Sequence, residues 1–373
     1  ICEGLVGSEM CIRDRPTIKP SIFLAVPRVW ERFQSGLLNK INESDKKDLA
    51  LKAIDNGLER VEYEQRGETP PLGVRIKDAV FKRLVFERSF KEGLGLSNTE
   101  IFATAAAPMN PEVHKWFHAI HIDVTEIYGM TEDTGPATIG IPNHAINYVE
   151  SMFKSNNVPI PEVLNPIGKV GIPLAGTEVK VLDDGELCIK GKHVAKGYYK
   201  LDDETKETFD SDGWLHTGDL AEIDDNGYVK IVGRKKEILI TSGGKNIAPV
   251  EIEDHVKPHT LVGQICIVGD GKKFLSALIV LDGDGGAEKW AEENGVEYNI
   301  SDMSKNSKVI DAIQEQIDEA NSKVARVQQI KKFILLENEW TDSSGELTPT
   351  LKLKRNVIAE RYKNEIESMY EEA

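Results

Sequence analysis

The chain has 373 residues, and its 46 Lys and Arg against 62 Asp and Glu give a formal net charge of −16. The length favours two or three domains, and the ordinary contents of apolar residues and glycine exclude collagen, coiled-coil arrays and bulk disorder. The acidic balance argues against a nucleic acid as partner, because a broad phosphate-binding face needs an excess of positive charge.

The apolar runs and the cysteines bear on where the protein works. No uninterrupted apolar stretch approaches the roughly 18 residues of a spanning helix, so no transmembrane segment is predicted, while a peripheral membrane contact stays open. The four cysteines are too scattered for a disulfide framework, which favours a reducing, cytoplasmic compartment.

The first 15 residues have neither a helical nor a strand period, and they lack the apolar run of a signal peptide. Their sequence resembles translated adapter sequence. We therefore expect residues 1–15 to be a non-native tail and the chain to start inside a longer protein.

The pattern of apolar and charged residues changes along the chain. A short apolar run at residues 22–26 precedes charged stretches with helical spacing between residues 30 and 96, which predict a surface layer of helices. Residues 165–232 consist instead of short β-rich runs broken by Asp-Gly and Asn-Gly. These breaks predict hairpins over residues 179–189 and 221–229.

Beyond residue 233 strands and helices alternate, which predicts a compact α+β module. Predicted strands cover 237–241, 264–268, 274–281 and 332–336, and predicted helices start near 249 and cover 309–324. Apolar residues at helical spacing from 357 to 370 predict one amphipathic C-terminal helix docked on this module. We place the domain boundary at residues 233–236.

Three local patterns suggest ligand sites but have simpler explanations. His114 and His118, with His121 nearby, could present two imidazoles to a metal, but nothing completes the ligand set, so we expect an ordinary surface helix. Residues 242–245 resemble the end of a Walker phosphate loop without the upstream glycine and the final hydroxyl residue. Residues 282–286 favour a solvated turn over a calcium loop.

Five segments carry groups suited to binding a nucleotide. Residues 128–132, Tyr-Gly-Met-Thr-Glu, follow a predicted strand and could stack a base, bond a phosphate and hold a metal. The small residues at 103–108 would let a ligand ring lie against the backbone. Asp219, on a predicted tight turn, could accept both hydroxyls of a ribose. The other two segments are residues 233–246 and 347–355.

In this order and at these separations, the five segments resemble the adenylate-forming superfamily. That superfamily contains the acyl-CoA synthetases, the luciferases and the adenylation domains of peptide synthetases. The resemblance covers nearly everything from residue 16 to the end. The chain looks most like the long-chain acyl-CoA synthetases of the bubblegum type, on residues 26–31, 236–246 and 345–355.

The resemblance implies which residues bind the nucleotide and CoA. Tyr128 would line the adenine, Asp219 would hold the ribose, and Arg234 would reach ribose or phosphate. Gly243 and Gly244 would leave room for the pantetheine arm of CoA. The whole implied set is Ala106, Ala107, Pro108, Tyr128, Gly129, Asp219, Arg234, Gly243 and Gly244.

The resemblance also implies the catalytic residues. Thr131 would contact the α-phosphate, and Glu132 would bind Mg²⁺. Lys352 would be the mobile lysine that bonds the carboxylate and the phosphate oxygens as the acyl-adenylate forms. Taken singly, each residue has an ordinary explanation: Asp219 can cap a turn, and Lys352 can lie on a solvated face.

Two departures from the family pattern set limits. Ala105 stands where the family usually has Gly, which alters the backbone approach to the adenine. The Ser/Thr/Gly-rich phosphate loop with its lysine is absent from the 373 residues. We therefore expect the upstream half of the large domain to be missing, and this chain alone to be inactive or unable to fold cleanly.

The expected fold is α/β and α+β. It comprises the C-terminal part of the large adenylation domain at residues 16–232, a β-rich subdomain at about 165–232, and a mobile lid at 233–373. The implied function of the parent protein is ATP-dependent ligation of a long-chain fatty acid to CoA, with ATP, Mg²⁺ and CoA. Another adenylate-forming reaction, or a non-catalytic nucleotide-site fragment, stays open as the alternative.

Overall fold

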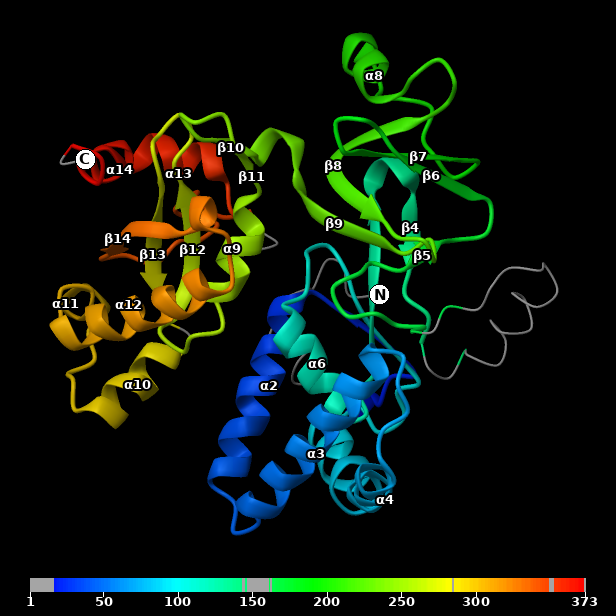
Figure 1. Ribbon diagram of the computed structural model, residues 1–373, viewed down its shortest axis with the longest axis vertical. Coiled ribbons are helices and arrows are strands. Elements are labelled where there is room, and N and C mark those ends of the chain that lie inside the picture. Colours follow the sequence, from blue (N-terminus) through cyan, green and yellow to red (C-terminus); the bar gives the residue numbers. More distant parts are fainter. Residues whose placement is uncertain are drawn as a thin grey trace. The chain divides into compact units, whose positions relative to one another are not determined.

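The computed structural model describes residues 17–142, 145, 161, 163–283, 285–348 and 352–371. The chain divides into two compact units, Ile1–Ile231 and Val232–Ala373, which are coloured from blue to green and from green to red in Figure 1. Each unit has its own hydrophobic core and is described by itself. The expected tail at residues 1–15 lies outside the described residues.

The first unit is built on a five-stranded mixed sheet with the order β1-β2-β3-β4-β5. Strands β1 to β3 are parallel, and β4 and β5 continue the sheet antiparallel. Thr104 at the end of β2 pairs with both Ala25 of β1 and Glu126 of β3, so β1 and β2 end at one level while β3 continues to Met130. The strands are β1 (Ile22–Ala25), β2 (Ile101–Thr104), β3 (Val124–Met130), β4 (Gly135–Ile139) and β5 (Ile172–Pro173).

A layer of helices covers this sheet, as the helical spacing predicted. Trp30 of α2 lies fully buried at the centre of the core, edge-on to Phe117 of α6, and its indole donates to the Ala103 carbonyl at 3.3 Å. Helix α3 packs against both α4 and α6. The helices are α2 (Pro27–Asn42), α3 (Lys47–Gln65), α4 (Leu72–Phe81), the π-helix η2 (Lys82–Phe90), α5 (Lys91–Gly93) and α6 (Pro111–Ala119).

The prediction of an exposed histidine face on α6 is wrong. His114 is fully buried and bonds the Val124 carbonyl at 2.7 Å through Nε2, and His118 lies 3.3 Å from Asp123 through its own Nε2. Burial, helped by His114, lowers the pKa of His118 to about 4, so this ring is neutral at pH 7. Among the described residues, no group of three or more His, Cys, Asp or Glu side chains is placed so that it could hold a metal ion.

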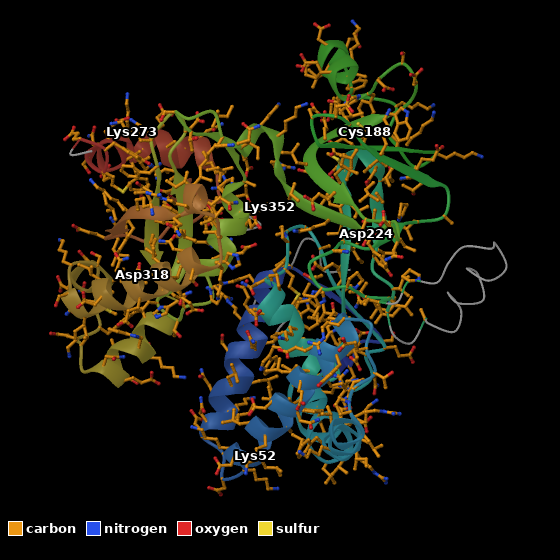
Figure 2. All side chains as sticks on the ribbon, in the orientation of Figure 1. Lys52, Cys188, Asp224, Lys273, Asp318 and Lys352 are labelled. Carbon is orange, nitrogen blue, oxygen red and sulfur yellow. The ribbon has the colours of Figure 1, made fainter. Side chains whose placement is uncertain are left out.

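The β-rich part of the first unit is a four-stranded sheet, and the predicted hairpins are confirmed. Strands β6 and β7 pair antiparallel. Strands β8 and β9 are also neighbours in the sheet, and in the turn between them Asp224 accepts from the Asn226 and Tyr228 amides at 2.9 Å. Figure 2 labels Asp224 and the buried Cys188 in this region. The elements are β6 (Thr177–Val181), β7 (Glu186–Gly191), α8 (Asp202–Thr208), β8 (Leu215–Ile223) and β9 (Val229–Arg234).

The second unit is an α+β module around a three-stranded sheet, β12-β13-β14. Strand β13 is antiparallel to β12 and parallel to β14, and all its residues are buried. Its side chains alternate between two cores, with Ile279 in one and Leu278 in the other, because helices cover both faces.

The bounds of the second unit's elements complete the fold. The first segment contains η5 (Lys235–Glu237), β10 (Leu239–Ile240), β11 (Asn246–Ile247), α9 (Pro249–Val256), β12 (Val262–Val268) and β13 (Leu275–Leu281). The second contains α10 (Gly286–Asn294), α11 (Ile300–Met303), α12 (Ser307–Ser322), η6 (Arg326–Gln328), β14 (Ile330–Leu336), α13 (Arg355–Arg361) and α14 (Lys363–Ser368).

Two predictions about this unit need correction. The strand expected at 237–241 is a 3₁₀ turn followed by the two-residue strand β10. The expected single C-terminal helix is two helices, because the backbone at Tyr362 (φ −103°, ψ 30°) leaves the helical region. Ile358, Ile366 and Tyr370 still pack on the sheet, as predicted. No helix in the described part of the chain is long and apolar enough to cross a membrane.

Candidate active site

The carboxyl edge of the parallel strands gathers two of the predicted segments. Because β2 and β3 pair in parallel up to Thr104 and Glu126, the turn at residues 105–108 leaves the sheet where β3 runs on into the segment at 128–132. Ala106, Ala107 and Pro108 are all exposed on that turn. Ala106 has a φ of 73°, in the left-handed region that non-glycine residues rarely adopt. Such strain costs about 1–3 kcal/mol and is typical of functional sites.

Tyr128 joins this edge to the β-rich sheet. Its hydroxyl donates to Oδ2 of Asp219, on β8, at 2.7 Å, and Asp219 is buried. Burial and the neighbouring carboxylate both raise the pKa of Tyr128, so the phenol keeps its proton at neutral pH. The structure thus brings together two predicted site residues that lie 91 positions apart.

Asp219 is held by a short network on β7 and β8. The Thr217 hydroxyl accepts from the Asp219 amide at 3.1 Å and donates to the Leu187 carbonyl at 2.7 Å. The Gly218 amide donates to Glu186 at 3.0 Å, and Gly218 has a left-handed φ of 71°. Sequence reasoning missed Glu186, because its contact is made across strands and leaves no local signal.

Gly129 is required by the packing of the backbone. A Cβ atom there would lie 1.9 Å from the Gly135 carbonyl oxygen, so β3 and β4 could not approach as they do. Asp133 fixes the turn between these strands, because its Oδ1 accepts from the Met130 and Gly135 amides, each at 3.1 Å. Burial raises the pKa of Asp133. Sequence reasoning missed Asp133, although Asp before Thr-Gly is a turn signal.

Two residues of a loop in the β-rich part form hydrogen bonds with Glu132. The Tyr198 hydroxyl donates to Glu132 Oε1 at 2.7 Å, and the Ala195 amide donates to the Glu132 carbonyl at 2.7 Å. Burial, followed by the bond to Glu132, raises the pKa of Tyr198. Thr131, next to Glu132, is exposed. A hydroxyl and a carboxylate therefore follow each other directly after β3. Oxygen groups of this kind are ligands for hard cations such as Mg²⁺.

The remaining predicted residues belong to the second unit. Arg234 ends β9, and Gly243 and Gly244 form the turn between β10 and β11, where the Thr241 amide donates to the Lys245 carbonyl at 3.0 Å. Gly244 has a φ of 74°, which explains glycine at that position. This hairpin turn agrees with the rejection of a Walker loop.

Lys352, labelled in Figure 2, is exposed in the second unit. Leu347 and Leu353, on either side of it in the chain, form an isolated antiparallel bridge. The Thr348 amide donates to the Lys352 carbonyl at 2.8 Å, and the Lys352 amide donates to the Thr348 hydroxyl at 3.0 Å. These two bonds join Lys352 to Thr348.

A buried ion-pair network follows Lys352 in the chain and is centred on Arg355. Arg355 donates to both carboxylate oxygens of Glu253, on α9, at 2.6 and 2.7 Å, and to Glu237 at 2.9 Å. The Glu253 side chain is only 1% exposed. Burial alone would raise the pKa of Glu253, but Arg355 outweighs it and holds the pKa below its ordinary value. Glu253 was missed from sequence because its partner lies 102 residues away.

Comparison with known protein families gives two matches along the chain. Residues 5–199 match the family described as AMP-binding enzyme, and residues 236–373 match the AMP-binding enzyme C-terminal domain. The fold agrees with solved structures. The adenylation domain of a carboxylate reductase from Mycobacterium chelonae superposes with a TM-score of 0.64 at 20% identity, over 97% of this chain and 48% of that one.

Curated relatives are more similar in sequence. The chain is 34% identical over 355 residues to the long-chain-fatty-acid–CoA ligase FadD15 of Mycobacterium bovis, covering 94% of this chain and 55% of the relative. It is 34% identical over 381 residues to the long-chain-fatty-acid–CoA ligase ACSBG2 of Xenopus laevis, covering 95% of this chain and 48% of the relative. The chain spans about half the length of these relatives.

These matches cover both units, and the mixed α/β architecture is that of adenylation domains. The chain therefore belongs to the AMP-binding enzyme family.

Proposed function

We propose that the protein containing this chain ligates a long-chain fatty acid to CoA in two steps. In the first, a carboxylate oxygen of the fatty acid attacks the α-phosphorus of ATP, and pyrophosphate leaves. In the second, the CoA thiol attacks the acyl carbonyl, the thiol proton is lost, and AMP leaves. The names of the relatives, FadD15 and ACSBG2, support this choice of substrates.

The observation that carries the proposal is the bond from Tyr128 to Asp219, made by the strand that pairs with β2 ahead of the 105–108 turn. The exposed small residues of the turn would let the adenine lie against the backbone. The Asp219 carboxylate is suited to accept ribose hydroxyls, because its position is fixed by Thr217 and Tyr128. The exposed hydroxyl of Thr131 would donate to the α-phosphate.

Mg²⁺ fits the chemistry of Glu132. The ion prefers one or two carboxylates together with substrate phosphates, and Glu132 supplies a partly exposed carboxylate beside Thr131. The bond from Tyr198 would orient this carboxylate. When bound, Mg²⁺ would neutralise negative charge on the phosphates during the first step.

The second unit would serve both steps as a mobile lid. Lys352 carries a long, exposed cationic side chain, which suits the charge that develops during adenylation. Arg234 would bond the ribose or a phosphate, while the glycine turn at 243–244 would admit the pantetheine arm of CoA in the second step. Rotation about residues 233–236 would present the two regions in turn.

We further propose that contact with lipid is peripheral. A long-chain fatty acid partitions into membranes, so an enzyme that uses it gains substrate by binding to a membrane surface.

The test is a product analysis of the intact protein that contains this chain. With ATP, Mg²⁺, CoA and palmitate we expect palmitoyl-CoA and AMP in equal amounts, measured by mass spectrometry. Asp219→Asn should raise the KM for ATP far more than the KM for palmitate. Formation of ADP, or a preference for short acids over all long ones, would contradict the proposal.

A further inference from the structure

An apolar stripe lies exposed on α4 and on the π-helix that continues it. Leu72, Ile76, Val80 and Leu84 recur at every fourth position, and their exposed fractions are 69%, 58%, 49% and 67%. We call these four residues the apolar stripe. Helix α4, labelled in Figure 1, places the stripe on the first unit. Four large apolar side chains in one row exceed the scattered exposure that is normal for a protein surface.

The rotation of this helix is fixed by its opposite face. Val74 and Asp78 are buried there. Asn56 donates to the Val74 carbonyl at 3.2 Å, Arg60 donates to Asp78 at 3.0 Å, and His121 lies 3.1 Å from the same carboxylate oxygen. Burial alone would raise the pKa of Asp78, but His121 and Arg60 outweigh it and hold the pKa low. These contacts hold the opposite face of α4 against the core, so the stripe points away from it.

Basic residues border the stripe. Arg75, Lys77, Lys82 and Arg83 are all exposed. At about 100° per residue in α4, Arg75 falls on one flank of the stripe and Lys77 on the other, while Lys82 and Arg83 open η2 directly before Leu84. A basic segment of this kind is notable in a chain whose net charge is −16. It is complementary to an anionic partner.

We propose that this face of α4 and η2 binds the interfacial region of an anionic membrane. An apolar row flanked by Lys and Arg is the pattern of a helix that lies in the headgroup plane. The long basic side chains can reach the phosphates while the apolar row enters the acyl boundary. A second copy of the chain fits less well, because both flanks are basic and pairing would bring like charges together.

This inference names the surface for the peripheral contact proposed above, and it rests on that proposal only for its biological purpose. Lipid binding by the stripe needs neither nucleotide nor catalysis. Its test can therefore fail or succeed independently of the ligase activity.

The experiment is vesicle co-flotation of the purified intact protein that contains this chain. Vesicles of phosphatidylcholine are compared with vesicles that contain about 30% phosphatidylserine. We expect the protein to float at least ~10-fold more with the anionic vesicles, and added salt to reduce this binding. The Ile76→Ser/Leu84→Ser variant should lose binding by ~10-fold or more, because both apolar anchors are replaced.

Charge and control variants complete the design. Arg75→Gln/Lys82→Gln should lose about 5-fold per charge on anionic vesicles and little on neutral ones. The control Ile310→Ser/Val327→Ser removes two exposed apolar side chains of the second unit, which are 38% and 43% exposed, and should bind like the unchanged protein. Circular dichroism verifies that each variant is folded.

Three results would overturn the inference. One is that the unchanged protein stays with neither vesicle type. Another is that the stripe variant and the control bind equally well. The third is that sedimentation reveals a dimer that only the stripe variant dissociates, which would assign the stripe to self-association. Full ligase activity of the intact protein on detergent-dispersed palmitate, with no vesicle binding, would reject the stripe alone and leave the proposed function standing.

Discussion

Arg355→Met is expected to destabilise the second unit strongly. The substitution removes two bonds to Glu253 and one to Glu237, and it leaves the Glu253 carboxylate buried without its guanidinium. Breaking a buried ion pair in this way costs about 3–5 kcal/mol. Because a domain is typically stable by only about 5–15 kcal/mol, the loss is a large part of the total.

Unfolding is followed along a urea titration by hydrogen exchange measured on individual peptides. This reports the stability of the two units separately. Peptides of α9 and β12 should lose protection in Arg355→Met, while peptides of α2 and α3 should not. Arg355→Met/Glu253→Gln should recover part of the loss, because no buried charge is then left alone. As a matched control, Lys323→Met breaks the exposed pair with Glu319 and should change little.

The network also predicts how stability depends on pH. The pKa of Glu253 is lowered in the folded state, so the folded state binds fewer protons than the unfolded state. Its contribution is therefore present above the unfolded pKa of about 4.3 and is lost as the pH falls through the lower folded pKa. Loss of less than about 1 kcal/mol in Arg355→Met, or no coupling in the double-mutant cycle, would refute this reasoning.

Three further predictions concern the candidate site. Gly129→Ala should destabilise the first unit by about 1–3 kcal/mol or more, because its Cβ would meet backbone at 1.9 Å, whereas Gly243→Ala, with its nearest atom at 3.9 Å, should be tolerated in the same denaturation assay. Lys352→Ala in the intact protein should slow acyl-adenylate formation by about 100-fold in a single-turnover assay, yet leave thioester formation from supplied adenylate; equal loss of both steps would make the lysine structural. Tyr198→Phe should raise the Mg²⁺ concentration needed for half-maximal adenylation by about 10-fold, whereas Tyr199→Phe, at the exposed neighbouring position, should leave it unchanged. Identical Mg²⁺ titrations of the two variants would contradict a role for Glu132 in binding the metal.

Local signals in the sequence were sufficient for the hairpins and for most elements of the second unit. The Asp-Gly and Asn-Gly turns specify their own geometry, so the β6–β7 hairpin and the turn at Asp224 could be predicted without knowledge of the rest of the fold. The apolar spacing of α12 was equally clear, since its buried residues recur on one face.

Long-range packing explains what sequence reasoning missed. The polar face of α6 was expected in solvent, but His114 is buried because the Val124 carbonyl of β3 supplies a partner for its ring. The bonds of Tyr128 to Asp219 and of Arg355 to Glu253 join residues 91 and 102 positions apart. No local pattern contains such pairs. The family resemblance named Tyr128 and Asp219 as residues of one site, but it gave no indication of Glu253.

The most direct test of the central claim follows an oxygen atom. The intact protein is given palmitate labelled with ¹⁸O in both carboxylate positions, together with ATP, Mg²⁺ and CoA. If the carboxylate attacks the α-phosphorus and AMP then leaves from the acyl carbon, each AMP formed carries one ¹⁸O in its phosphate, which mass spectrometry detects. AMP without the label, or ADP with free phosphate as the products, would contradict an acyl-adenylate.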